Sequence, residues 1–453
     1  MLEQQDWIRV APDMEIEWRQ QWEEGRDVAA FQDRCRALAR RAAEGQDCEA
    51  EADALCAAMQ RAPARAGYPY EEPEEWEALC AVRGPAAQLP APERDRLPDR
   101  IAGAWTGRIA GCLLGKPLEM LRSATIEDIL HSTGNWPLSR YIDSRTFPEG
   151  LAERVAADKA APWEKCWVDT IGGAVPVDDD TNYTVFALKL VETYGRNFRP
   201  NDVLEGWLTW LPMLSTCTAE RAAYRNAAQG LTAPDTARRR NPYREWIGAQ
   251  IRGDFFGYLT PGHPRAAAEM AWRDGCISHV RNGVYGELYA AALVAAAASA
   301  STMEAVVQAA LAEIPPRSRL YAEVCEVLEG WRSGRSWDDT RRFLVQRFDE
   351  NCQHDWCHVL SNARIVTAAL LYGGGDFGRS ICLAVGSAFD TDCDGATVGS
   401  VVGMFAGAAA IPAAWTEPFG GKLRTSIDGY PLVSVGELTK KTLALCTEQE
   451  KVQ

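Results

Sequence analysis

Apolar residues recur at helical spacing along most of the chain, and no run of alternating β-branched residues marks a strand. The spacing is clear in three segments, near 286–312, around 318–332 and near 338–348. The pattern predicts one Ala-rich helix for the first segment and one helix for each of the other two. We therefore expect an all-α fold, without internal repeats.

Composition divides the chain into three parts. Residues 1–66 are rich in Glu, Arg, Gln and Ala, with apolar residues at helical spacing, which predicts an N-terminal helical extension. Residues 67–100 contain many prolines and little periodicity, which is typical of a linker. Residues 101–453 return to helical patterns and are expected to form the main domain. A chain of 453 residues is longer than one hydrophobic core usually organises, which agrees with such a division.

Two stretches place glycines four residues apart, on one face of a helix. The first contains Gly103, Gly107, Gly111 and Gly115, and the second contains Gly399, Gly403 and Gly407. Each glycine costs a helix about 1 kcal/mol relative to alanine, so such a row is favourable only where something packs close against the backbone. We expect the two helices to cross closely and to bring their ends together.

Charge and apolar content exclude several classes of protein. The chain has 63 acidic and 48 basic side chains, and its one dense basic run lies at 238–240, which argues against nucleic-acid or anionic-membrane binding. The apolar stretches at 288–301 and 397–415 are mostly Ala and Gly, and Pro412 interrupts the second, so neither predicts a membrane span. The N-terminus lacks the apolar core of a signal peptide, and 14 cysteines are scattered along the chain. These features favour reduced thiols and a cytoplasmic location.

The stretch FDTDCDGATVG resembles the start of a calcium-binding loop, because Asp390, Asp392 and Asp394 alternate along it. In such a loop the ninth and twelfth positions also supply ligands. Here those positions are Val398 and Val401, which have no side-chain oxygen. The missing acid at the twelfth position nearly excludes a calcium loop.

A second acidic group, Asp178, Asp179 and Asp180, opens the helical run VDDDTNYTVFALKLVE. One aspartate there needs only a capping role, since helix N-caps and first turns favour acids. Three adjacent carboxylates repel one another, and a divalent cation makes that arrangement favourable. Carboxylates from two helix starts suit Mg²⁺, Mn²⁺ or Ca²⁺ better than zinc. From the pattern alone, capping and metal binding are equally open.

The segment NCQHDWCHV offers a competing metal site, with Cys352, His354, Cys357 and His358 close together. The histidines share a helix face that the cysteines do not, and the spacing is not that of a zinc finger. We favour the alternative in which these side chains pack at the start of a helix or line a pocket wall.

Four blocks of sequence, in the same order, resemble the ADP-ribosylglycohydrolase family, the group that includes the dinitrogenase-reductase-activating glycohydrolase. The blocks are GRIAGCLLGKPLE, DDDTNYT, the pair REWIGAQIRGDFFGY and ISHVRNGVYGE, and DTDCDGATVGS. They extend over roughly residues 100–415. None is decisive by itself, but four in order make the resemblance specific. It implies a compact, all-α ADP-ribosylglycohydrolase-like domain.

The resemblance also implies a site with two Mg²⁺ or Mn²⁺ ions. Its implied metal ligands are Asp178, Asp179, Asp180, Asp390, Asp392 and Cys393. Its implied catalytic residues are Glu119, Asp179 and Asp392. The residues implied along the ribose and phosphates are Gly248, Gln250, Arg252, His279, Asn282, Gly283 and Gly286. Packing or a turn explains the three glycines nearly as well, and a surface ion pair would explain Arg252.

The chain departs from the family pattern at two positions. Cys112 stands where many members have Asp, and Cys393 stands where Thr, a hydroxyl ligand, is frequent. A thiol is a poor ligand for Mg²⁺, so either Cys393 contributes nothing, or water or Asp394 takes its place. These departures leave the metal preference and the substrate type open.

The activity implied by the resemblance is divalent-metal-dependent hydrolysis of the glycosidic bond in an ADP-ribosyl or related ribosyl adduct. The expected partners are an ADP-ribosylated protein or an ADP-ribosyl or ribosyl small molecule, and neither nucleic acid nor membrane. One alternative keeps the metal site but acts on nucleosides or other free ribosides, because a fold does not fix the leaving group. Another binds ADP-ribose without turnover, which only Cys112 and Cys393 suggest.

Overall fold

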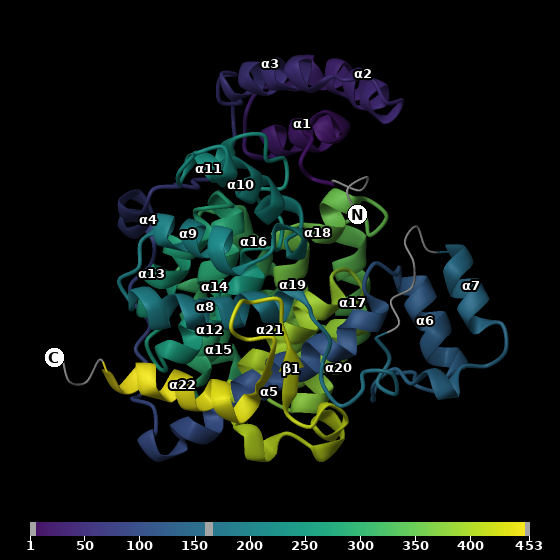
Figure 1. Cartoon of the computed structure of the whole chain (residues 1–453), viewed down its shortest axis with the longest axis vertical. Helices are drawn as coiled ribbons and strands as arrows, with labels where there is room; N and C mark the ends of the chain where they lie inside the picture. Colours follow the sequence, from purple (N-terminus) through teal and green to yellow (C-terminus); the bar gives the residue numbers. More distant parts are fainter. Residues whose placement is uncertain (1–5, 159–165, 449–453) are drawn as a thin grey trace.

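The computed structural model describes residues 6–158 and 166–448, and helices dominate it (Figure 1). Within these ranges the only sheet is a short antiparallel hairpin of β1 (Lys422–Arg424) and β2 (Leu432–Ser434). The prediction of an all-α fold is confirmed. Among the described helices, none is both long enough and apolar enough to cross a membrane.

Two antiparallel helices, α5 (Leu97–Gly115) and α21 (Thr391–Ala406), lie in contact through their glycine rows. The facing pairs are Gly103 with Gly403, Gly107 with Gly399, and Gly111 with Gly395. A Cβ atom built on Gly111 would lie only 1.9 Å from the carbonyl oxygen of Gly395. The close crossing predicted from the glycine rows is confirmed, and it joins the C-terminal end of α5 to the N-terminal end of α21.

Further helices pack around this pair. Those in contact with α5 or α21 are α8 (Asp179–Tyr194), α12 (Asp254–Leu259), α14 (Arg281–Ala297), α19 (Val359–Gly373), α20 (Phe377–Val385) and α22 (Val435–Glu448). The outer ones are α6 (Ser123–Ser132), α7 (Leu151–Asp158), α9 (Pro200–Trp210), α10 (Thr218–Ala228), α11 (Asp235–Arg238), α13 (Pro264–Gly275), α15 (Met303–Leu311), α16 (Arg319–Arg332), α17 (Trp337–Arg347) and α18 (Gln353–Cys357). Their apolar faces form one large buried core.

The helices predicted from periodicity are found, with one correction. The predictions for α16 and α17 are confirmed to within one residue at each end. The Ala-rich segment is not one helix, because it breaks between α14 and α15. The side chain of Thr302 caps the second helix by accepting a hydrogen bond from the N–H of Ala305 at 3.1 Å. A capping threonine starts a new helix where composition alone shows continuous alanine.

The first helices, α1 (Met14–Glu23), α2 (Gln32–Ala43) and α3 (Glu49–Gln60), stack at one end of the molecule (Figure 1). Their apolar residues form a small core of their own. Toward the rest of the chain α1 presents buried polar groups: Glu17 pairs with Arg244 at 2.6 Å. The N-terminal segment therefore contacts the main body through such pairs, and also through Trp7 and Ile16, which pack against the buried apolar cluster of Ala219, Tyr243 and Trp246.

The segment predicted as a linker contains a short helix, α4 (Trp76–Val82), and packs on the main body. Glu72 pairs with Arg319 at 2.8 Å. The helix α5 begins before the predicted end of the linker, because Pro98 occupies its first turn, where a missing N–H costs nothing. The boundaries proposed for the extension, the linker and the main domain stay predictions.

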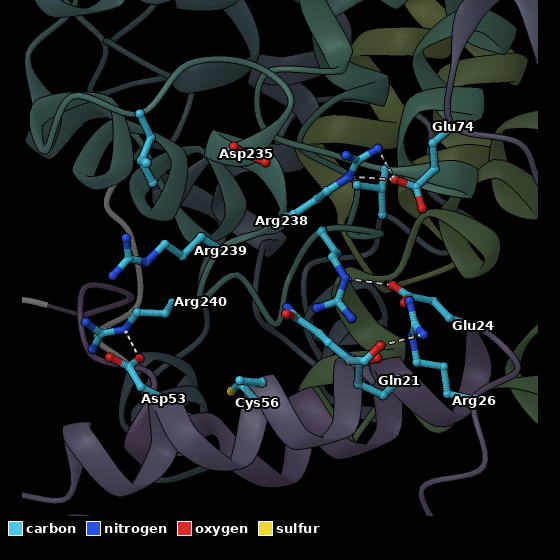
Figure 2. A pocket seen from close by; sticks show the side chains of 15 residues that line it. Gln21, Glu24, Arg26, Asp53, Cys56, Glu74, Asp235, Arg238, Arg239 and Arg240 are labelled. Atoms are coloured by element: carbon cyan, nitrogen blue, oxygen red, sulfur yellow. Dashed lines mark hydrogen bonds and ion pairs between the residues drawn. The ribbon is translucent and has the colours of Figure 1, made fainter. Parts of the chain in front are cut away.

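A cavity of about 750 Å³ lies between the N-terminal helices and the main body (Figure 2). Ion pairs at its wall join Arg238 to Glu74 at 2.8 Å, Arg240 to Asp53 at 2.9 Å and Arg244 to Glu24 at 2.7 Å. These three arginines already pair with carboxylates, so the cavity lies within a polar interface between two packed parts of the chain.

Candidate metal centre

The two acidic sequences begin helices that meet the end of α5. Asp178 is the N-cap of α8, where its side chain accepts a hydrogen bond from the N–H of Asp180 at 2.9 Å. Asp390 takes the N-cap position of α21 without a side-chain cap bond, and Asp392 lies in the first turn. Capping therefore accounts for Asp178 and leaves the carboxylate of Asp390 unexplained.

Three overlapping groups of possible ligand atoms result, each with its atoms within 4.8 Å of one another. The groups are Cys112, Asp178 and Asp180; Asp180, Asp392 and Cys393; and Glu119, Asp390 and Asp392. Asp180 is shared by the first two and Asp392 by the last two. The fold thus brings together side chains that lie more than 200 positions apart in the sequence.

The carboxylates of this cluster are buried and incompletely paired. Asp178, Asp180, Asp390 and Asp392 are at most 5% exposed, and Asp180, Asp390 and Asp392 each have a carboxylate oxygen without a hydrogen-bond partner among the described residues. Burying such oxygens is costly, and their charges repel one another. Hard divalent cations bind carboxylate oxygens of this kind. The carboxylate donors therefore fit a hard divalent cation.

Most of these carboxyl groups titrate above their usual range. Burial and then the charge of Asp178 raise the pKa of Asp180 well above its ordinary value and that of Asp179 to about 7. Burial and neighbouring carboxylates raise the pKa of Asp390 and of Asp392 well above the ordinary value. Asp178 differs: burial opposes its ionisation, but an adjacent lysine ammonium lowers its pKa.

That ammonium belongs to Lys116, which directly follows α5. Its Nζ lies 2.8 Å from Glu119, 2.9 Å from Asp178 and 3.2 Å from Asp392. Burial by itself lowers the pKa of Lys116, but these carboxylates raise it well above its ordinary value. The lysine therefore stays charged inside the acidic cluster.

Polar contacts behind the cluster hold its backbone. The guanidinium of Arg108 is fully buried and donates to the backbone oxygen of Asp180 at 2.7 Å. The side-chain oxygen of Asn362 accepts a hydrogen bond from the N–H of Asp390 at 3.2 Å. The hydroxyl of Thr391 donates to the backbone oxygen of Gly115 at 2.8 Å. These bonds fix the three segments that carry the acids.

Two predicted or alternative ligands lie outside the groups of described atoms. Asp179 belongs to none of them, so its predicted roles as ligand and catalyst stay predictions. Asp394 is fully buried and also joins none of them, whereas the thiol of Cys393 does. The structure thus gives no support for Asp394 as a replacement for Cys393.

The hypothesis of a calcium loop, which the sequence nearly excludes, is wrong for a structural reason. Asp392, Val398 and Val401 all lie within α21, and both valines are fully buried. A calcium loop needs extended turns that wrap its ligands around one ion. The stretch is instead a helix start followed by a packed helix.

The residues predicted along the substrate are mostly committed to contacts within the protein. The three glycines are closely packed. A Cβ atom built on Gly248 would lie 2.1 Å from Glu220, one built on Gly283 would lie 2.5 Å from Arg244, and one built on Gly286 would lie 2.3 Å from Val359. Arg252 is 1% exposed, so the surface ion pair considered for it is wrong. It pairs internally with Glu220 at 2.8 Å and Asp274 at 2.5 Å.

The other three predicted substrate residues differ in how free they are. The side-chain amide of Asn282 donates a hydrogen bond to Glu245 at 2.9 Å and accepts one from the N–H of Leu320 at 2.9 Å. His279 shares a 2.8 Å hydrogen bond with Ser278, and its second ring nitrogen has no partner in the described chain. Gln250 is 1% exposed, and neither atom of its amide has a described partner. All the predicted substrate roles stay predictions.

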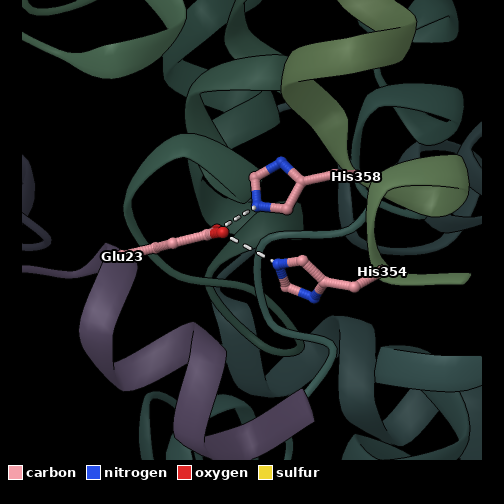
Figure 3. Close-up of side chains that lie close together, drawn as sticks. All are labelled: Glu23, His354 and His358. Carbon is pink, nitrogen blue, oxygen red and sulfur yellow. Dashed lines mark hydrogen bonds and ion pairs between the residues drawn. The ribbon is translucent and has the colours of Figure 1, made fainter. Parts of the chain in front are cut away.

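The two histidines of the competing zinc site face a carboxylate, and the two cysteines considered with them do not join the group. The Nε2 atoms of His354 and His358 lie 3.1 Å and 3.6 Å from the carboxylate of Glu23, at the end of α1 (Figure 3). Neither Cys352 nor Cys357 joins this group in the described residues. The four-ligand zinc site weighed from the sequence is therefore not formed.

Hydrogen bonds on the far side of both rings also oppose a metal between them. The indole N–H of Trp246 donates to Nδ1 of His354 at 3.1 Å, and the N–H of Leu360 donates to Nδ1 of His358 at 3.2 Å. These groups only donate, so each Nδ1 carries a lone pair and each Nε2 carries the proton. A metal-bound histidine needs the reverse arrangement. The cluster suits hydrogen bonding to Glu23 and does not suit a metal.

The sequence interpretation missed two residues of the site. Lys116 had a usable signal, because it stands three positions before Glu119 and shares its turn. Asn362 had none, because it lies in an apolar helix and reaches Asp390 only through the fold.

Comparison with known proteins identifies one family. A sequence model of the ADP-ribosylglycohydrolase family matches residues 93–448, a range that includes α5 and both acidic helix starts. No curated protein sequence matches the chain. One similar solved structure is described as an "ADP-ribosylglycohydrolase-related protein complex"; it shares 20% sequence identity, covers 78% of this chain and 99% of its own, and has a TM-score of 0.48.

Proposed function

Because the chain belongs to the ADP-ribosylglycohydrolase family, we propose that it is a divalent-metal-dependent hydrolase of the glycosidic bond in an ADP-ribosyl adduct. Membership of the family supports glycohydrolase activity on such adducts. The metal-dependent part rests on one observation: buried carboxylate oxygens without partners gather at the starts of α8 and α21. The proposed substrate is an ADP-ribosylated protein or small molecule.

The proposed ligands for two Mg²⁺ or Mn²⁺ ions are Asp178, Asp180, Asp390 and Asp392, with the thiol of Cys393 beside them. When bound, such ions supply Lewis-acid stabilisation and lower the pKa of a coordinated water. The side chains themselves orient a ribose at the open edge of the cluster, where Glu119 is 25% exposed.

In the proposed reaction the bond between the anomeric carbon of the ribose and the leaving group breaks, and a bond to a water oxygen forms. The leaving group departs with the electron pair and gains a proton, and the water loses one. Positive charge develops on the ribose in an oxocarbenium-like state. The carboxylates of Asp390 and Asp392 stabilise that charge because they lie beside Glu119 in a buried, preorganised cluster.

Two carboxyl groups suit the proton transfers. Glu119 is partly exposed and lies 2.8 Å from the ammonium of Lys116, and it is the proposed base that takes the proton of water. In the ion-free protein, burial and the charge of Asp178 raise the pKa of Asp179 to about 7. Asp179 is the proposed acid for the leaving group.

A comparison of substrates tests the proposal. ADP-ribosyl-arginine and simple ribosides are incubated with the protein and Mg²⁺ or Mn²⁺, and product is followed by chromatography. We expect release of ADP-ribose, loss of turnover in EDTA, and no turnover by Asp392→Asn. The matched control is Asp338→Asn, which changes an exposed acid in the first turn of α17 and is expected to keep full activity.

Other outcomes would select the alternatives. Hydrolysis of free ribosides alone would make the protein a riboside hydrolase. Tight ADP-ribose binding in calorimetry, without product after prolonged incubation with either ion, would make it a binding protein. Turnover that persists in EDTA would contradict the metal-dependent mechanism.

A further inference from the structure

The backbone of Lys116 is fixed against the start of α21. The preceding residue, Gly115, packs so closely that a Cβ atom built there would lie 2.2 Å from the backbone oxygen of Thr391. The hydroxyl of Thr391 in turn donates to the backbone oxygen of Gly115 at 2.8 Å. The lysine therefore enters the cluster from a rigid backbone junction, and its side chain is 14% exposed.

The ammonium meets acids from three different chain segments. Glu119 comes from the turn after α5, Asp178 from the start of α8 and Asp392 from the first turn of α21. An ammonium has three N–H donors, and these three carboxylates match them. Glu119 and Asp392 share one group of possible ligands and Asp178 belongs to another, so Nζ lies where those groups adjoin. A single positive charge thus links the whole cluster.

We propose that Lys116 is a built-in counter-cation of the acidic site: it holds Asp178 and Asp392 together when no divalent ion is bound, and it is displaced from them when one binds. This inference rests on the proposed metal-dependent function. Oδ1 of Asp178 already accepts a hydrogen bond from the N–H of Asp180, so a divalent ion at this carboxylate competes with the ammonium for Oδ2, and the two positive charges repel each other. Lys116 therefore lowers the affinity of the site for divalent ions and keeps the ion-free protein folded.

The same arrangement offsets part of the repulsion among six neighbouring acids in the ion-free site. The acids concerned are Glu119, Asp178, Asp179, Asp180, Asp390 and Asp392. Arg108 offsets only part of this charge, because it also pairs with Asp254 at 3.0 Å. Without Lys116, Arg108 would be the one basic side chain among the described residues that pairs with these carboxylates.

Calorimetric titration with Mn²⁺ alone tests the proposal on the full chain. The test variant is Lys116→Met, which keeps the length of the side chain without its charge. Lys441→Met is the matched control, because Lys441 on α22 also pairs with an acid, Glu192 at 2.9 Å, but lies outside the acidic cluster. We expect Lys116→Met to bind Mn²⁺ about tenfold more tightly or better, because one repelling charge is removed. Its ion-free melting temperature should fall and recover with Mn²⁺, and the control should match the unchanged protein in both respects. Unchanged or weaker Mn²⁺ binding by Lys116→Met overturns the proposal.

A structure of the unchanged protein with Mn²⁺ gives a second test that does not depend on the variant folding. The proposal predicts that Nζ of Lys116 moves out of hydrogen-bond distance from Asp178 and Asp392; an ammonium still in contact with both would overturn it. Failure of the proposed function looks different. Tighter Mn²⁺ binding by Lys116→Met, with no hydrolysis by either protein, would uphold the role of the lysine and reject the hydrolase. Mn²⁺-dependent hydrolysis, with the same Mn²⁺ affinity in Lys116→Met as in the unchanged protein, would uphold the hydrolase and reject the role of the lysine.

Discussion

The backbones of Gly111 and Gly395 touch, although 283 other residues separate them in the sequence. This contact holds the end of α5 against the start of α21 and so sets the distance between Lys116, Glu119 and the acids of α21. The candidate metal centre depends on it, because no side chain at either position leaves the two helices so close.

Replacing Gly111 with Ala should therefore destabilise the protein. The new methyl group would meet the carbonyl oxygen of Gly395 at 1.9 Å, so the helices must separate. We expect a loss of about 3 kcal/mol in the free energy of unfolding, at the upper end for overpacking, measured by urea denaturation. Gly436→Ala is the control, because a Cβ at this position on α22 meets no atom within 4 Å. Equal stability of the two variants would show that the helix contact is not tight.

Asp180→Asn should abolish stabilisation by Mn²⁺. Asp180 belongs to two of the three ligand groups, and an amide oxygen does not replace its negative charge. At a hundredfold excess over the dissociation constant, Mn²⁺ should stabilise the unchanged protein by about 3 kcal/mol, seen as a higher melting temperature. The variant should show no such rise, while Asp338→Asn should show all of it. A full shift in Asp180→Asn would place the ion elsewhere.

Glu24→Gln should weaken the junction between α1 and the main body in a pH-dependent way. Burial opposes the ionisation of Glu24, but Arg244 and Arg281 lower its pKa from 4.5 to about 2. The folded protein therefore holds the charged form more strongly than the unfolded chain does. This stabilisation is complete above about pH 5 and disappears as the pH falls toward 2.

At pH 7 the variant should lose about 3 kcal/mol of unfolding free energy, and the difference from the unchanged protein should shrink steadily below pH 4.5. Urea denaturation across this range measures both. Glu44→Gln, at an exposed position, serves as the control and should change little at any pH. A pH-independent difference for Glu24→Gln would contradict the role of its charge.

Glu23→Gln should leave the zinc content of the purified protein unchanged. Both histidines that face Glu23 accept hydrogen bonds at Nδ1, so neither has a lone pair for a metal at Nε2. Elemental analysis of the two proteins measures zinc directly. Loss of one bound zinc in the variant would show that Glu23, His354 and His358 form a metal site after all.

The sequence by itself determined the elements and the chemistry that they carry. Helical spacing predicted the all-α fold, the glycine rows predicted a close crossing, and Asp178 with Asp390 marked two acidic helix starts. These features are local, because caps and faces of a helix follow from residues a few positions apart. They also carry the resemblance to a family, which depends on the order of short motifs.

Only the tertiary structure decided which of these groups meet. It placed Lys116 among three acids, set Asn362 behind Asp390, and joined Glu23 to histidines more than 300 positions away. It also showed that Arg252 is a buried ion-pair centre. Such contacts depend on how the helices pack and on which charged side chains become buried together and must pair. The spacing of residues along one segment predicts neither of these.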